Sequence, residues 1–310
     1  MPDISINLAG IKFSNPTILA SGILGVTKDS LKYVVKNGAG GCVIKSISKE
    51  ERKGHNAPNM HAIEGGFMNA VGYSNPGLEK AKKEFTNLKD VGGPVIASII
   101  GTDADEFAYM AENLLSEEFA AVEAVLSCPH TPGYGTLAGQ GTPEATEEIT
   151  KKVRAKTKLP LFIKVSPESQ PIGEIAKAAE AAGADAISAT NSMGPGIHLD
   201  IYAKKPILHF GMGGVSGPAL RPIAARCVSD IYQSVKIPVI GIGGVTCGRD
   251  AIEMMLLGAS AVQVGTAVYY RGAEVFKKIT DEIEEYLKQE GFESVNDIIG
   301  IIHEKQWKNG

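Results

Sequence analysis

The sequence predicts a (β/α)8 TIM barrel, a closed barrel of eight parallel strands surrounded by helices. Eight short apolar runs, each bounded by Gly, Pro or polar residues, have the length and composition of buried parallel strands. Helical patterns separate nearly all of these runs, as expected for repeated β-then-α units. The strands are predicted at Thr17–Ala20, Cys42–Ile44, Pro94–Ile100, Ala120–Leu126, Leu159–Val165, Ala186–Ala189, Pro238–Ile242 and Ala261–Val264.

An open, doubly wound sheet is the alternative fold. A dinucleotide-binding fold of that kind would place a G-x-G-x-x-G motif directly after the first strand. The stretch from Ala20 to Gly25 reads A-S-G-I-L-G and does not supply the motif. A chain of 310 residues is long enough for one large core, so we expect residues 1–310 to form a single barrel domain.

The remaining elements are placed in chain order around these strands. Alternating apolar and polar residues from Ile4 to Phe13 predict an N-terminal β-hairpin that covers one end of the domain. Long excursions at 47–93 and 193–214 predict insertions after the second and sixth strands. Helices are predicted at Asp29–Asn37, Gly77–Leu88, Asp103–Leu115, Thr142–Lys156, Ile172–Ala182, Gly217–Val235, Asp250–Leu257 and Ala273–Lys288.

Composition and charge exclude several classes of protein. Apolar residues make up 44% of the chain and charged residues 21%, as in globular enzymes. The 35 acidic residues outnumber the 31 basic ones, which argues against nucleic-acid binding, and no apolar run approaches the length of a membrane span. The four cysteines lack C-x-x-C spacing and the N-terminus does not resemble a signal peptide. We therefore expect a cytoplasmic protein that binds no metal, nucleic acid or membrane.

Candidate functional residues follow the predicted strands. In a TIM barrel, the carboxyl ends of all eight strands meet at the face that carries the active site. The glycines after the last two strands, together with Gly217 and the helix after Gly265, predict a phosphate cradle of backbone N–H groups. Tight turns between strand and helix are the alternative explanation for these glycines. The strand-end residues are Ala20, Ser21, Lys45, Ser46, Ser127, Cys128, Lys164, Asn191, Ser192, Gly243, Gly244, Gly265 and Thr266.

Two lysines fall inside apolar runs. Burying Lys45 and Lys164 costs free energy unless each ammonium group has an anionic or hydrogen-bonding partner. No Asp or Glu occupies the matching strand ends, so we expect a bound ligand that gains negative charge. A reduced flavin, held by its phosphate, has this property.

The chain resembles the class 1 dihydroorotate dehydrogenases over almost its whole length, and the class 1B catalytic subunits most of all. Together the shared motifs are highly specific. They are Asn15-Pro16, Ile44-Lys45-Ser46, Asn69-Ala70-Val71-Gly72, Asn75-Pro76-Gly77, Ser127-Cys128-Pro129, Phe162-Ile163-Lys164, Thr190-Asn191-Ser192, Gly213-Gly214-Val215-Ser216-Gly217-Pro218, Gly241–Gly244 and Val264-Gly265-Thr266.

The resemblance implies an FMN-dependent oxidoreductase of pyrimidine biosynthesis, which acts on the CH–CH bond of dihydroorotate. Cys128, as the thiolate, would accept a proton from the substrate while a hydride passes to flavin N5. The residues implied to bind substrate are Lys45, Asn69, Ala70, Val71, Gly72, Asn191 and Ser192. Those implied to bind FMN are Ala20, Ser21, Lys45, Ser46, Lys164, Gly217, Gly243, Gly244, Gly265 and Thr266.

Two positions depart from the family pattern and leave alternatives open. Val125 and His130 stand where the family usually has asparagines that bind the pyrimidine, and Ser-Cys-Pro-His is shared with dihydropyrimidine dehydrogenases. One alternative is therefore a paralogue acting on another dihydropyrimidine or cyclic amide, and a second is a non-catalytic flavin-binding barrel. For partners, the resemblance implies a homodimer, with either a separate FAD/2Fe–2S subunit or a soluble electron acceptor.

Overall fold

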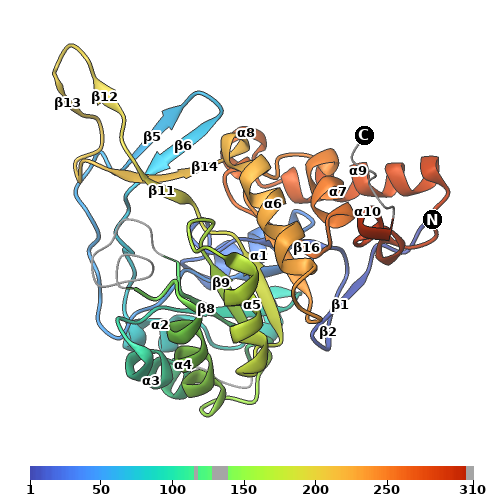
Figure 1. Ribbon diagram of the computed structural model, residues 1–310, viewed down its shortest axis with the longest axis horizontal. Helices are drawn as coiled ribbons and strands as arrows, with labels where there is room; N and C mark the ends of the chain where they lie inside the picture. Colours follow the sequence, from blue (N-terminus) through green and yellow to red (C-terminus); the bar gives the residue numbers. More distant parts are fainter. Residues whose placement is uncertain (115–117, 128–138, 305–310) are drawn as a thin grey trace.

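The structure is a computed structural model that describes residues 1–114, 118–127 and 139–304 (Figure 1). Eight parallel strands form a closed barrel in the order β3-β4-β7-β8-β9-β10-β15-β16, and β16 closes against β3. The predicted fold class is therefore confirmed and the doubly wound alternative is wrong. The strands are β3 (Thr17–Leu19), β4 (Gly41–Val43), β7 (Val95–Ile99), β8 (Ala121–Val125), β9 (Leu161–Val165), β10 (Ala186–Ala189), β15 (Val239–Ile242) and β16 (Ala259–Val264).

Helices follow the strands and pack around the barrel. Thr142 caps the start of α4, because its side chain accepts a hydrogen bond from the Ala145 N–H and Pro143 occupies the first helical position. The helices are α1 (Lys28–Lys36), α2 (Leu78–Glu84), α3 (Ala104–Leu114), α4 (Pro143–Arg154), α5 (Ile172–Ala181), α6 (Arg221–Tyr232), α7 (Gly248–Leu256), α8 (Ala267–Arg271), α9 (Val275–Glu290) and α10 (Ile301–Glu304). Short 3-10 turns are η1 (Leu88–Val91), η3 (Pro218–Leu220) and η4 (Val295–Ile298).

The segment from Gly217 to Val235 differs from the single long helix that was predicted. It divides into η3 and α6, and Pro222 occupies the first turn of α6. Proline has no N–H and cannot donate to the preceding turn, so the two pieces remain separate. The helix predicted at Ala273–Lys288 is present as α9, and Val275, Ile279, Ile283 and Leu287 are all buried on one of its faces.

The N-terminal hairpin of β1 (Ile6–Leu8) and β2 (Ile11–Phe13) covers the amino end of the barrel. Phe13 is fully buried, and its ring lies so close to Gly41, at the start of β4, that a side chain there would collide with it. In Figure 1 the hairpin lies on the opposite side of the barrel from the two insertions.

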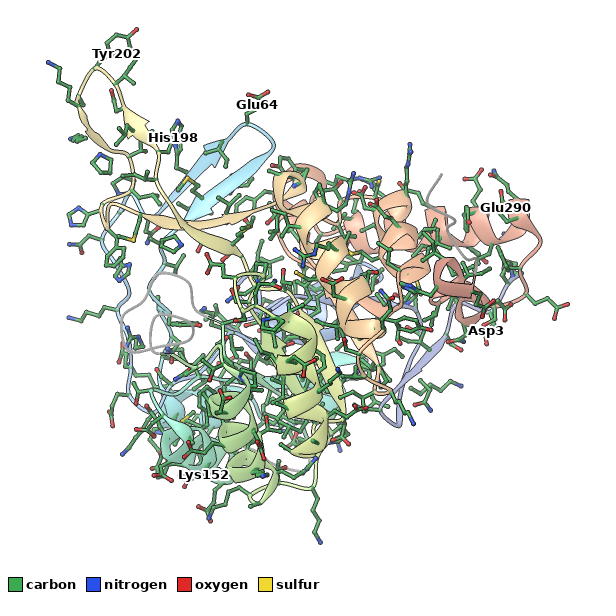
Figure 2. The ribbon with its side chains drawn as sticks, viewed as in Figure 1. Asp3, Glu64, Lys152, His198, Tyr202 and Glu290 are labelled. Carbon is green, nitrogen blue, oxygen red and sulfur yellow. The ribbon has the colours of Figure 1, made fainter. Side chains whose placement is uncertain are left out.

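The two insertions pair with each other, which was not predicted. The first contributes β5 (Met60–Ile63) and β6 (Gly66–Asn69), and the second contributes β11 (Met193–Gly196) and β14 (Gly213–Ser216). They form one sheet in the order β11-β14-β6-β5, here called the insertion sheet. A hairpin of β12 (Leu199–Asp200) and β13 (Lys205–Pro206) projects beyond it, with Tyr202 near its tip (Figure 2).

Apolar side chains fill the space inside the barrel and between the barrel and the helices, with Phe107, Phe162 and Phe276 among the largest that are fully buried. The main cluster is continuous around the barrel wall, as in a single hydrophobic core. None of the helices in the described ranges is both long and apolar enough to cross a membrane.

Candidate active site

A cavity of about 270 Å³ lies at the carboxyl ends of the barrel strands, where the insertion sheet adjoins the barrel. Ala70 does not line it; its backbone N–H binds the Asn59 carbonyl and it packs beside Met68 and Leu208. Cys128 lies outside the described residues. Ser127, another strand-end candidate, is fully buried and is not part of the cavity lining. The other predicted site residues line the cavity: Ala20, Ser21, Lys45, Ser46, Asn69, Val71, Gly72, Lys164, Asn191, Ser192, Gly217, Gly243, Gly244, Gly265 and Thr266.

Three glycines form a cradle in the cavity wall. Gly217, Gly243 and Gly244 have φ values of +92°, +128° and +76°, which side chains rarely adopt. A Cβ on Gly217 would lie 2.9 Å from Gly66 Cα, and one on Gly244 would lie 2.8 Å from the Gly217 carbonyl oxygen. Close backbone packing therefore requires glycine here, which leaves main-chain groups exposed to a ligand.

The helix after Gly265, which was predicted to contribute to the cradle, is short. That helix, α8, has only five residues, so few peptide dipoles are aligned in it. The Thr266 hydroxyl donates a hydrogen bond of 3.1 Å to Ser216 Oγ, which joins the loop after β16 to the start of η3. An anion would be held mainly by the backbone and hydroxyl groups of these loops.

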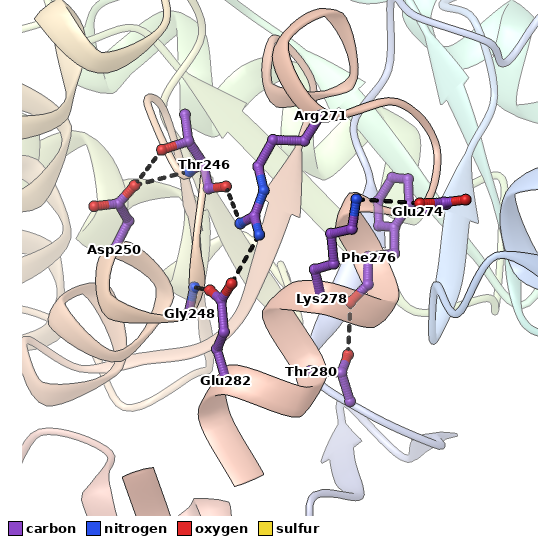
Figure 3. Close-up of polar contacts among 9 residues, drawn as sticks. All are labelled: Thr246, Gly248, Asp250, Arg271, Glu274, Phe276, Lys278, Thr280 and Glu282. Atoms are coloured by element: carbon purple, nitrogen blue, oxygen red, sulfur yellow. Dashed lines mark hydrogen bonds and ion pairs between the residues drawn. The ribbon is translucent and has the colours of Figure 1, made fainter. Parts of the chain in front are cut away.

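A polar network supports the loop after β15 from behind (Figure 3). Arg271 donates to the Thr246 carbonyl at 2.9 Å and to Glu282 Oε1 at 2.8 Å, and Glu282 also accepts from the Gly248 N–H. Asp250 Oδ2 accepts from the N–H and the hydroxyl of Thr246, at 2.9 and 2.7 Å. Sequence reasoning missed this network, because it joins residues on three different segments.

Lys164 has a buried partner, which corrects a sequence-based expectation. Its Nζ lies 3.5 Å from Glu123 Oε1, and the two side chains are 5% and 0% exposed. The strand ends carry no Asp or Glu, as noted, but the expectation that only a ligand could partner Lys164 was wrong. Glu123 lies inside β8 rather than at its end, on the same inward face as Val125, because strand side chains alternate.

Further polar side chains surround this carboxylate. Glu123 Oε2 accepts hydrogen bonds of 2.7 Å from Ser188 Oγ and from Gln263 Nε2. Glu123 Oε1 and Gln263 Oε1 have no hydrogen-bond partner in the described part of the chain. Barrel interiors are usually filled by branched apolar side chains, so a polar layer directly below the cavity indicates a requirement of the site.

Lys45 occupies a different setting from the one predicted. It lies two residues beyond β4, at the strand end, but it is half-buried rather than buried in the core as expected. Its ammonium group lies 5.6 Å from the centre of the Tyr73 ring, within range of a cation–π contact. Lys45 therefore presents a charge at the cavity without the full desolvation cost of a core lysine.

Asn191 fixes the chain next to the predicted base. Its Nδ2 donates a 2.6 Å hydrogen bond to the carbonyl of Ser127, and its Oδ1 accepts a 2.8 Å bond from the Ser192 N–H. Ser127 directly precedes Cys128 in the sequence. The amide thus holds the backbone at the end of β8 against the cavity.

Apolar and aromatic side chains complete the wall. Val125 lines the cavity and packs with Ile100 and Tyr73. At another part of the wall, the Phe67 ring lies 5.1 Å from that of Tyr269. Of these, only Val125 was singled out in the sequence; Tyr73 and Phe67 adjoin the Asn69–Gly72 motif but lack any polar pattern of their own.

Two of the other cysteines, Cys42 and Cys227, are buried packing residues. Burial raises the pKa of the Cys42 thiol to about 12 and that of the Cys227 thiol to about 11. Neither forms a disulfide. Both stay protonated near neutral pH and are poor nucleophiles.

The fold and the cavity define a class of protein: a (β/α)8 barrel with a ligand-sized cavity at the carboxyl ends of its strands, where enzymes of this fold carry their active sites. The family model for dihydroorotate dehydrogenase matches residues 3–287. The chain belongs to the dihydroorotate dehydrogenase family, whose members are FMN-dependent flavoproteins and oxidoreductases acting on CH–CH bonds.

Individual relatives agree with this assignment. The chain is 49% identical over 298 residues to the dihydroorotate dehydrogenase B (NAD(+)) catalytic subunit of Pyrococcus abyssi, covering 96% of this chain and 98% of that one. It is 42% identical over 306 residues to the protein of the same name in Methanocaldococcus jannaschii, covering 97% and 98%. A solved Eimeria tenella structure, described as DHODH in complex with ferulenol, matches with a TM-score of 0.82 at 23% identity, covering 98% of this chain and 90% of that one, and supports the fold.

Proposed function

We propose that this chain is the catalytic subunit of an FMN-dependent dihydroorotate dehydrogenase, which oxidises dihydroorotate to orotate in pyrimidine biosynthesis. The observation that carries the proposal is the cavity itself. It joins a glycine cradle for a phosphate to a buried lysine that suits a ring gaining negative charge.

The residues present fit FMN. The backbone of Gly217, Gly243 and Gly244 and the loop at Thr266 would hold its phosphate, while Lys164 and Gln263 would face the ring. Gln263 Oε1 is buried and has no hydrogen-bond partner among the residues that the structure describes, which supports this fit, because a buried acceptor without a donor is costly unless a ligand or water supplies one. When bound, FMN supplies the two-electron acceptor for the substrate hydride.

The other side chains of the cavity would bind the substrate and move its proton. Lys45 offers a positive charge to the carboxylate of dihydroorotate, and Asn69 offers an amide to its ring. Asn191 keeps one N–H and one lone pair after binding the backbone, enough for a further contact. Cys128 would take the proton at Sγ; the support is its place directly after Ser127, which Asn191 holds at the cavity.

Partners, domain organisation and location remain part of the proposal. The Pyrococcus and Methanocaldococcus relatives are named catalytic subunits, which supports a separate partner subunit. We propose that this partner carries FAD and a 2Fe–2S cluster and that the barrel forms a homodimer. We also propose that residues 1–310 act as one domain in the cytoplasm.

Anaerobic titration of the purified protein tests the function. We expect dihydroorotate to bleach the flavin absorbance near 450 nm, and a Cys128→Ser variant to bleach far more slowly. Dihydrouracil and dihydrothymine form the comparison, because the apolar Val125 wall favours a second candidate, oxidation of another dihydropyrimidine. Bleaching by these compounds but not by dihydroorotate would replace the proposed substrate, and a colourless protein would remove the flavoenzyme assignment.

A further inference from the structure

Glu123 lies behind the cavity wall and has no role in the proposed reaction. It is fully buried in a cluster of four side chains, each from a different barrel strand: Glu123 from β8, Lys164 from β9, Ser188 from β10 and Gln263 from β16. The carboxylate accepts from Ser188 and Gln263 and faces the Lys164 ammonium. Of these partners, Lys164 and Gln263 line the cavity.

The carboxylate determines which way the Gln263 amide points. An ionised carboxylate only accepts hydrogen bonds, so the Gln263 atom that contacts it must be the NH₂ group. The amide oxygen is then left buried and without a partner in the described residues. Glu123 therefore fixes the amide so that its oxygen, and not its NH₂ group, is the atom left for another hydrogen-bonding group.

The ammonium group of Lys164 is charge-compensated but not saturated. At 3.5 Å, its contact with Glu123 is an ion pair without a well-formed hydrogen bond, and it has no other polar contact among the described residues. Its N–H groups remain available to an acceptor in the cavity. Lys164 thus presents donors and Gln263 an acceptor, a pattern that matches neighbouring C=O and N–H groups on a heterocyclic edge.

We propose that Glu123 is a positioning residue that acts through Lys164 and Gln263 to set the reduction potential of the bound cofactor. The inference rests on the proposed FMN site. A cofactor that gains negative charge on reduction is stabilised by Lys164, and the nearby carboxylate offsets part of that stabilisation. Removing the charge of Glu123 makes reduction more favourable.

The test is a dye-equilibrated anaerobic titration of the FMN midpoint potential in the holoenzyme and in Glu123→Gln. Glutamine keeps the size and one acceptor oxygen but removes the charge. We expect the reduced form to gain at least tenfold over the oxidised form, a rise of about 30 mV for a two-electron couple. Ser188→Ala is the matched control, because it removes one hydrogen bond to Glu123 and leaves both charges; its potential should change much less.

A double-variant cycle shows whether the effect passes through Lys164. In a Lys164→Gln background, Glu123→Gln should no longer raise the potential. An unchanged potential in the single variant, or an equal rise without Lys164, would overturn the proposal. If Glu123→Gln does not fold, Glu123→Asp replaces it, because aspartate keeps the charge but draws it back by one methylene. The FMN midpoint potential should then rise by a smaller amount, and no rise overturns the proposal. A wild-type protein without FMN instead contradicts the proposed function.

Discussion

Gly217 offers a direct test of the cradle, through substitution by alanine. Its backbone adopts φ +92° and ψ −168°, a region essentially restricted to glycine, so any side chain there costs about 1–3 kcal/mol in strain. The new Cβ would also lie 2.9 Å from Gly66 Cα and 3.3 Å from Thr266 Cγ2. Because a backbone atom cannot rotate away, overpacking adds about 1–3 kcal/mol.

Gly272 provides a matched control. Its φ of +69° and ψ of −177° fall in the same region, yet a Cβ there meets no atom within 4 Å. Gly272→Ala therefore carries the backbone strain alone, whereas Gly217→Ala carries the strain and the collision. The difference between the two variants isolates the contact at the cavity wall.

The assays are chemical unfolding and FMN binding followed by flavin fluorescence. We expect both variants to lose stability, with Gly217→Ala losing more. Relief of the collision moves Gly217 within the cradle, so FMN affinity should fall by about 5- to 150-fold in that variant, the equivalent of 1–3 kcal/mol. Gly272→Ala should keep wild-type affinity. Equal FMN affinities in the two variants would refute the reasoning.

Two further predictions concern titrating groups. In the native protein at pH 8, Cys42 and Cys227 should resist alkylation, since burial raises the pKa of each thiol to about 12 and about 11; peptide mapping after labelling checks this, and rapid labelling of either would contradict it. Burial also raises the pKa of Glu168, although it accepts a hydrogen bond from the Gly194 N–H. A carboxyl whose pKa is raised in the folded state makes the folded protein less stable as the pH rises above the pKa that this carboxyl has in the unfolded chain. Glutamine does not titrate, so Glu168→Gln should gain stability relative to the wild type as the pH rises from about 4 to about 7. Urea unfolding at both pH values gives the free energy of unfolding of the variant minus that of the wild type. This difference should increase from about pH 4 to about pH 7, and a decrease would contradict the prediction.

The sequence predicted most of the fold because the relevant information is local. Apolar runs of strand length, and helix signals such as Thr142 with Pro143, depend on neighbouring residues and were read accurately. The site was predictable for a related reason. In a closed parallel barrel, residues at strand ends must share one face, so Lys164, Asn191 and Gly243 could be grouped without knowing any contact.

Other features depended on contacts between distant segments. The insertion sheet pairs Met68 of the first insertion with Val215 of the second, and no local pattern specifies that register. The short α8 and the division before α6 likewise reflect packing and proline chemistry at particular turns.

Local sequence patterns were enough to predict the barrel, the face that carries the site and the kinds of side chain gathered there. How those side chains are paired depends on contacts in the folded chain, and the clearest case is Glu123 with Lys164. Adjacent strands β8 and β9 bring a carboxylate and an ammonium group within 3.5 Å although 41 positions separate them in the printed sequence. Periodicity shows which face of a strand a residue occupies, but only strand order and register, which arise from closure of the whole barrel, show which residue lies opposite it.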